Sequence, residues 1–236
     1  HYMVAAGTKE VLFNIFEGLV KPTPDGELIP AVAESYEVDG TTYTFKLREG
    51  IKFHNGEAVT VDDIVYSISR CADTSEGAPL VSAFSAITSV EAVDNKTVKI
   101  VINEPNGDFL AYLTSAIIPK DYNDQASNPV GTGPFRFVSR SPQENVILEK
   151  FDEYWGTPAN IDTVKLQVIA NADTIVTSLN GGSVDMFARI SQAQADQLSD
   201  DFDVLEGTMN LVQAMYLNNA KEPFDDVRVR QALCYA

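Results

Sequence analysis

Residues that could perform chemistry are few in this sequence, and their spacing does not gather them into a reactive centre. The histidines are His1 and His54, and no cluster of histidine and cysteine has the spacing of a metal site. No Gly-x-Ser-x-Gly elbow is present, and no histidine signal lies near Cys71. His54 sits in a strand-turn segment, where a structural role is expected. We therefore expect no metal, no cofactor and no catalytic residue.

The remaining motifs that resemble catalytic ones also have structural explanations. Adjacent carboxylates occur at Asp62-Asp63, Asp200-Asp201 and Asp225-Asp226, all at predicted helix starts or loops. Acidic residues there complement the helix dipole, which favours capping over acid-base catalysis. The loop at 131–134 is not a phosphate cradle, because Pro134 lacks a backbone donor and no lysine follows. The sequence therefore predicts a protein that is not an enzyme.

Composition and charge narrow the class of protein further. The 236 residues include 34 acidic and 17 basic side chains, for a net charge of −17. Such a field repels nucleic acid and anionic membranes, so neither is an expected partner. No apolar run reaches the ~18 residues of a membrane span, and no signal peptide pattern is present. Cys71 and Cys234 are too few for a disulfide scaffold and are expected to be buried, unbridged thiols.

Hydrophobic periodicity predicts alternating helices and strands. The best-defined helix begins after Thr60, where Asp63 completes a capping box and Val59 can pack against Ile64. A turn is expected at Asn55-Gly56, and Gly181-Gly182 should end a helix. We predict helices at 11–19, from 61, at 109–113, 172–179, from 192 and at 227–236, with strands at 43–48, 90–93, 97–102, 135–139, 145–149, 163–169 and 209–217.

Two features bear on organisation along the chain. Residues 128–134 are rich in proline, glycine and threonine, which indicates a crossing between two lobes. The last predicted helix ends with an apolar face and no capping residue, which leaves its final carbonyl groups without partners. We therefore expect the sequence to be a piece of a longer chain.

A series of sequence blocks resembles the extracytoplasmic solute-binding proteins of dipeptide, oligopeptide and nickel ABC importers. These blocks follow the family's order and spacing across almost the whole chain. They are Phe16-Glu17-Gly18-Leu19, 30–36, 44–56, 60–67, Gly131-Thr132-Gly133-Pro134-Phe135, Tyr154-Trp155-Gly156, 180–186 and 223–233.

The resemblance implies a two-lobed α/β clamp of which this chain is the amino-terminal half. Residues 1–17 and 131–236 would form a discontinuous first lobe like that of a periplasmic binding protein, with a mixed sheet and flanking helices. Residues 18–130 would form an inserted smaller α+β subdomain. The second ligand-clasping lobe would be absent from this chain.

The resemblance also implies a function. The protein would capture a peptide-like solute outside the cytoplasmic membrane and deliver it to an ABC permease. It would act as a monomer in the periplasm or on the cell surface, and any lipid anchor would lie outside this chain. A nickel chelate or an oligosaccharide remains an alternative ligand. A ligand-sensing regulatory domain with the same fold is an alternative of another class.

Two segments correspond to ligand-facing strand edges of peptide-binding relatives. They are Met3-Val4-Ala5-Ala6 and Phe187-Ala188-Arg189. An extended peptide can pair with such edges through main-chain hydrogen bonds. Arg189 could also pair with a peptide carboxylate, although it could equally face solvent or a neighbouring acid. Ordinary strand ends are the alternative for both segments, and Trp155 is expected in the core.

Overall fold

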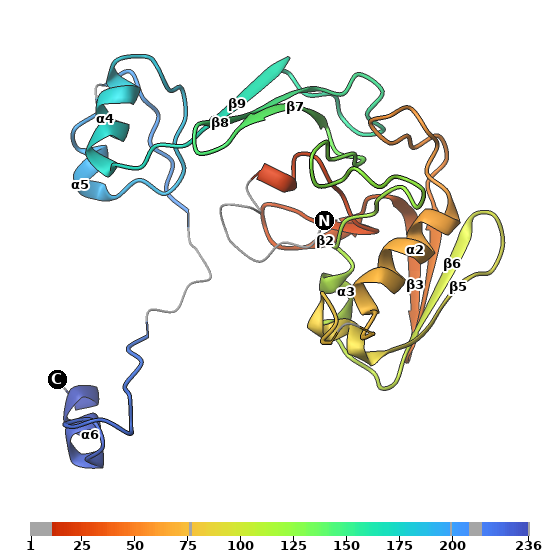
Figure 1. Ribbon diagram of the computed structural model, residues 1–236, viewed down its shortest axis with the longest axis horizontal. Helices are drawn as coiled ribbons and strands as arrows, with labels where there is room; N and C mark the ends of the chain where they lie inside the picture. Colours follow the sequence, from red (N-terminus) through yellow and green to blue (C-terminus); the bar gives the residue numbers. More distant parts are fainter. Residues whose placement is uncertain (1–10, 76, 199, 208–213, 236) are drawn as a thin grey trace. The chain divides into compact units, whose positions relative to one another are not determined.

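The protein is described by a computed structural model that covers residues 11–75, 77–198, 200–207 and 214–235. The chain divides into two compact units at residues 169 and 170 (Figure 1). Among the described residues, the first unit contains nine strands and the helices between them, and the second contains three helices. The chain therefore has the mixed α/β composition that the sequence predicts.

A four-stranded antiparallel sheet forms the centre of the first unit. Its strands are β3 (Ala33–Asp39), β4 (Thr42–Leu47), β5 (Ile87–Ala92) and β6 (Thr97–Ile102), in the order β3-β4-β6-β5. The strands predicted at 43–48 and 97–102 are confirmed. Their alternating residues Tyr43, Phe45, Val98 and Ile100 are buried, because alternate side chains of a strand share one face.

Helix α2 (Val61–Ala72) packs against β5 and β6 and is capped as predicted. The Thr60 hydroxyl accepts from the Asp63 amide, and the Asp63 carboxylate accepts from the Thr60 amide at 2.8 Å. Ile64 and Ile68 are buried against the sheet. The sequence around Thr60 is therefore sufficient to set the start of this helix.

Shorter elements complete the first unit. They are β1 (Val20–Pro22), β2 (Leu28–Pro30), the 3₁₀ helix η1 (Ser82–Ala86), α3 (Phe109–Tyr112), β7 (Phe135–Ser141), β8 (Asn145–Lys150) and β9 (Thr163–Gln167). Strands β1 and β2 form a two-stranded pair, and β7, β8 and β9 form a second, three-stranded antiparallel sheet. Strands were predicted at the positions of β7, β8 and β9, whereas the resemblance implied a mixed sheet.

Two hydrophobic clusters lie within the first unit. The larger one draws its buried residues from between Leu19 and Val130. The smaller one joins Ile15 and Phe16 to Phe135 and Leu148 of the second sheet, together with Ala116 and Ile118. Segments before residue 18 and after residue 130 therefore share a core, although the subdomain boundaries themselves stay a prediction.

The second unit contains α4 (Ala172–Asn180), α5 (Gln192–Ala195) and α6 (Val227–Tyr235). Helix α4 ends at the predicted glycine pair, where Gly182 has a φ of 68° that favours glycine. The predicted Ser191–Gln194 capping box is present. The Asp226 carboxylate accepts from the Arg228 amide at 2.8 Å, so it caps α6 as predicted.

Two predictions of local structure were wrong in the described residues. Residues 13–19 are not helical, because their backbone groups bond to a distant segment: Leu19 donates to the Leu113 carbonyl at 3.0 Å. Residues 209–213 of the predicted last strand lie outside the described residues. Residues 214–217 form no strand, and Tyr216 is 95% exposed. These four residues pair with none of the described strands, and a strand needs such a neighbour.

The two cysteines are free thiols that differ in environment. Cys71 is buried in α2, whereas Cys234 is exposed on α6, so the expectation of a buried thiol was wrong for Cys234. The second unit leaves most of α6 exposed, which explains the difference. Among the described residues, no helix is both long and apolar enough to cross a membrane.

Candidate functional site

The two predicted ligand-facing segments differ in what the structure describes. Met3, Val4, Ala5 and Ala6 lie outside the described residues. Residues 187–189 lie between α4 and α5 as irregular, exposed chain, and Phe187 is 39% exposed. Arg189 has a φ of 65°, a left-handed conformation that an extended strand does not adopt. The expected strand geometry is thus not observed at 187–189, while the ligand contact stays a prediction.

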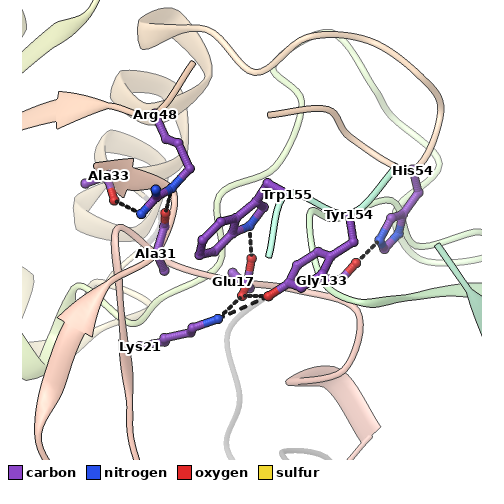
Figure 2. A network of polar contacts seen from close by, with 9 residues as sticks. All are labelled: Glu17, Lys21, Ala31, Ala33, Arg48, His54, Gly133, Tyr154 and Trp155. Atoms are coloured by element: carbon purple, nitrogen blue, oxygen red, sulfur yellow. Dashed lines mark hydrogen bonds and ion pairs between the residues drawn. The ribbon is translucent and has the colours of Figure 1, made fainter. Parts of the chain in front are cut away.

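The structure instead gathers a polar network around Glu17, which the sequence analysis missed (Figure 2). The Glu17 side chain is only 5% exposed. Its carboxylate accepts hydrogen bonds from the Trp155 indole at 2.6 Å, the Tyr154 hydroxyl at 2.7 Å and the Lys21 ammonium at 3.1 Å. A buried carboxylate is tolerated because these donors replace the water it has lost.

Two cations lie over the Trp155 ring. The Lys21 ammonium is 4.6 Å from the ring centroid, and the Arg48 guanidinium is 4.3 Å from it. Arg48 also donates to the carbonyl groups of Ala31 at 3.0 Å and Ala33 at 3.3 Å (Figure 2). Cation–π attraction and these hydrogen bonds join the loop at 154–155 to the start of β3.

The Tyr154 hydroxyl is held in its neutral form. Burial raises the pKa of Tyr154, and the negative charge of Glu17 raises it further. A neutral phenol keeps its proton and can donate a hydrogen bond to the carboxylate. Tyr154 therefore holds the Glu17 carboxylate by a hydrogen bond and keeps its own proton, which fits a structural role. We call the contacts of Glu17 with Trp155, Tyr154 and Lys21 the Glu17 joint.

A second contact set around His54 anchors the loop at 131–133. His54 Nδ1 accepts from the Gly131 amide at 3.3 Å, which leaves Nε2 to donate to the Gly133 carbonyl at 2.9 Å. The His54 ring also packs edge-on against the Phe151 ring, with 4.9 Å between the two ring centroids. Burial lowers the pKa of His54 to about 4, so the imidazole is neutral at pH 7. The structural role expected for His54 fits these contacts.

The same loop lies against the chain that precedes Glu17. A Cβ atom on Gly131 would lie 2.2 Å from the Ile15 carbonyl oxygen, and one on Gly133 would lie 2.5 Å from that of Asn14. Only glycine allows the two backbones to approach so closely. Together with the Glu17 network, the loop fixes residues 14–17, which follow the predicted ligand segment Met3–Ala6 in sequence.

Sequence signals for this joint existed but were incomplete. Glu17 is an acidic residue inside the apolar run from Phe16 to Leu19, and Tyr154-Trp155 is an aromatic pair. Trp155 does anchor a loop as expected, but it is only partly buried and its partner is a charged group. Glu17 and Trp155 are 138 positions apart, so only the fold pairs them. Within the described part of the chain, no group of histidine, cysteine and carboxylate side chains could hold a metal ion.

The fold places the chain in the class of periplasmic binding proteins. A solved binding protein, DppA from Helicobacter pylori in complex with the peptide STSA, superposes with a TM-score of 0.71 at 30% identity. That match covers 78% of this chain and 42% of the DppA chain. Residues 27–236 match the family described as bacterial extracellular solute-binding proteins, family 5, middle region. The chain belongs to this family.

Curated relatives agree with the family. A dipeptide-binding protein of Escherichia coli is 32% identical over 244 residues, covering 89% of this chain and 46% of the relative. A glutathione-binding protein, GsiB of Pectobacterium atrosepticum, is 31% identical and covers 97% of this chain and 47% of the relative. The chain therefore spans about half the length of the curated relatives it matches. Members of this family are extracellular binding proteins rather than enzymes.

Proposed function

We propose that this chain is the amino-terminal half of the substrate-binding component of an ABC importer that captures a peptide-like solute. The main support is the structural similarity of the chain to DppA, which was solved with a bound peptide. The chain is also 32% identical in sequence to a dipeptide-binding protein. The protein acts outside the cytoplasmic membrane as a monomer, delivers its solute to the permease and catalyses no reaction.

In this proposal the first lobe comprises residues 1–17 and 131–236, and residues 18–130 form the inserted subdomain. The cluster that joins Ile15 and Phe16 to the β7–β8–β9 sheet supports the assignment of both segments to one lobe. The Glu17 joint supports it further, because it fixes the chain where the two parts of that lobe meet.

The ligand contacts of this half are Met3–Ala6 and Phe187–Arg189. The exposure of Phe187 agrees with a contact that a ligand completes. Arg189 supplies the positive charge for a peptide carboxylate, which forms a strong charge-assisted hydrogen bond. The chain has a net charge of −17, so most of its charged side chains repel a carboxylate. The Arg189 guanidinium is therefore a selective partner for the peptide carboxylate.

Calorimetry on the natural full-length protein with unmodified dipeptides to pentapeptides tests the proposal. Wild type should bind at least one of these peptides. Arg189→Ala should weaken binding by roughly 1.5 to 3 kcal/mol, as expected for a hydrogen bond to a charged group. Arg140→Ala, which removes an exposed arginine from β7, is the matched control and should bind like wild type.

Two outcomes would contradict the proposal at different levels. An unchanged affinity of Arg189→Ala for every peptide would remove Arg189 from the site. Native mass spectrometry of the purified protein identifies an endogenous ligand independently. Binding of a nickel chelate or an oligosaccharide, with no peptide binding, would replace the peptide-like ligand class.

A further inference from the structure

A groove lies between α2 and strand β5, apart from the Glu17 joint. Its volume is about 960 Å³, within the range of ligand sites. One wall is formed by residues of α2 and by the residue that caps its carboxyl end. They are Asp62, Tyr66, Ser69 and Asp73. This spacing places the four residues on one side of a helix. The opposite wall is the segment Ile87–Val90 of β5.

The β5 wall offers unpaired backbone groups. Among the described strands, β5 is the last of its sheet and pairs only with β6. The Val93 amide donates to the Thr97 carbonyl at 2.8 Å, so by alternation Glu91 also bonds toward β6. The amide and carbonyl of Val90 and Ala92 then point to the open edge. An open edge is a template for one more strand.

The groove combines four apolar residues with polar residues and charged groups of both signs. Lys120 pairs with Asp62 at 3.3 Å, and the Asp73 carboxylate accepts from Ser75 at 2.9 Å, so these charges have partners. Val65, Ala72, Ile87 and Val90 are partly buried residues that pack on the core and also line the groove. Arg70 lies near the end of α2, where its guanidinium donates to the Tyr66 hydroxyl at 3.5 Å. Within the ranges that the structure describes, Arg70 forms no ion pair. It is therefore suited to a carboxylate from a binding partner.

The length of the groove fits a short extended segment. The stripe from Asp62 to Asp73 spans about 16 Å at the rise of a helix. About five residues of extended chain, at roughly 3.3 Å each, cover that distance. Every second side chain of such a segment would contact the partly buried apolar residues of the groove.

We propose that this groove binds an extended segment of another polypeptide, which joins the sheet beside β5 and places an acidic side chain at Arg70. Strand addition between an edge strand and a helix uses main-chain hydrogen bonds for affinity and pockets for selectivity. The arginine adds a requirement for negative charge. The inference concerns a protein partner and does not depend on the solute that the family site takes up.

Hydrogen exchange of the natural full-length protein tests the proposal with a capped probe, acetyl-Thr-Val-Glu-Val-Thr-Val-amide. At saturating peptide, exchange in the segment 87–92 should slow by roughly fivefold or more, because the edge amides become hydrogen-bonded. Exchange in β3, the other edge strand, should stay unchanged. The same peptide with lysine in place of glutamate should protect the segment 87–92 much less.

Two variants with matched controls separate strand addition from general binding. Val90→Pro removes a backbone amide that points to the open edge, and it should weaken the affinity for the probe peptide roughly fivefold. Val38→Pro makes the same change on β3, where Val38 is 50% exposed, and should not alter affinity. Arg70→Ala should also weaken the affinity for the probe peptide, whereas Arg140→Ala should leave it unchanged. The fold of each variant is checked by circular dichroism.

Several results would overturn the proposal. They include no protection of the segment 87–92, equal losses from Val90→Pro and Val38→Pro, or an Arg70→Ala affinity equal to that of wild type. Concentration-dependent protection of this segment without peptide would assign the groove to a second copy of the protein instead. Each readout is local to the groove, so failure here leaves the solute-binding test unaffected.

Discussion

The Trp155 indole donates a hydrogen bond of 2.6 Å to the Glu17 carboxylate, which lies 138 positions earlier in the chain. This bond closes a network in which Tyr154 and Lys21 hold the other oxygen of the same carboxylate. The network ties the chain before β1 to the loop after β8 (Figure 2). The first unit should therefore depend on this buried charge for its stability.

Replacing Trp155 with phenylalanine should lower the free energy of unfolding by about 2 to 3 kcal/mol. Phenylalanine keeps an aromatic ring but leaves one oxygen of a buried carboxylate without its donor. Urea denaturation followed by circular dichroism measures the loss. Glu153→Gln, which breaks an exposed ion pair with Lys52 next to the joint, should cost less than about 1 kcal/mol. Equal losses in both variants would contradict a special role for the Glu17 network.

Stability should fall as the pH is lowered from about 6.5 toward 4, because of His54. Its pKa is about 4 in the folded protein and ~6.5 in an unfolded chain, so the unfolded state binds more protons in this window. The free energy of unfolding should drop by about 2 kcal/mol from His54 between pH 7 and pH 5. Urea midpoints at the two pH values measure this change.

His54→Gln should flatten the same pH dependence, because glutamine can bond to the 131–133 loop without titrating. His1→Gln removes the other histidine of the sequence and should leave the dependence as in wild type. A dependence that persists fully in His54→Gln would show that other groups cause it.

Substituting alanine for Gly131 should destabilise the protein by about 3 kcal/mol or more. The new Cβ atom would lie 2.2 Å from the Ile15 carbonyl oxygen, and a backbone atom has little freedom to move away. Gly107→Ala is the matched control, because no atom lies within 4 Å of its ideal Cβ position. Thermal unfolding should show a large shift for Gly131→Ala and little for the control. A tolerated Gly131→Ala would contradict the close approach.

Thr132→Val should stabilise the protein by about 1 kcal/mol. The Thr132 hydroxyl is buried and has no hydrogen-bond partner among the described residues, so its burial is uncompensated. Valine has nearly the same shape without the polar atom. Thr132→Ser, which keeps the hydroxyl and removes the methyl group, should destabilise instead. If chemical denaturation ranks valine below threonine, the hydroxyl must have a partner.

Local sequence chemistry was enough to predict most of the secondary structure. The Thr60–Asp63 capping box, the alternation in 97–102 and the glycine pair after α4 each act through neighbours a few positions away. Such signals depend on backbone geometry and on hydrophobic period, which a sequence displays directly. The family blocks, read in order, also predicted the fold class.

Tertiary structure decided what depended on distant partners. The apolar run before Leu19 has a helical period, yet hydrogen bonds to Leu113 and Ile117 hold residues 17–19 in a non-helical path. Glu17 has a stable buried charge only because Trp155, Tyr154 and Lys21 reach it from separate segments. The groove beside β5 exists because strand order leaves that strand at the edge. Sequence spacing encodes contacts a few residues apart, whereas the pairing of remote groups is set by how the whole chain packs.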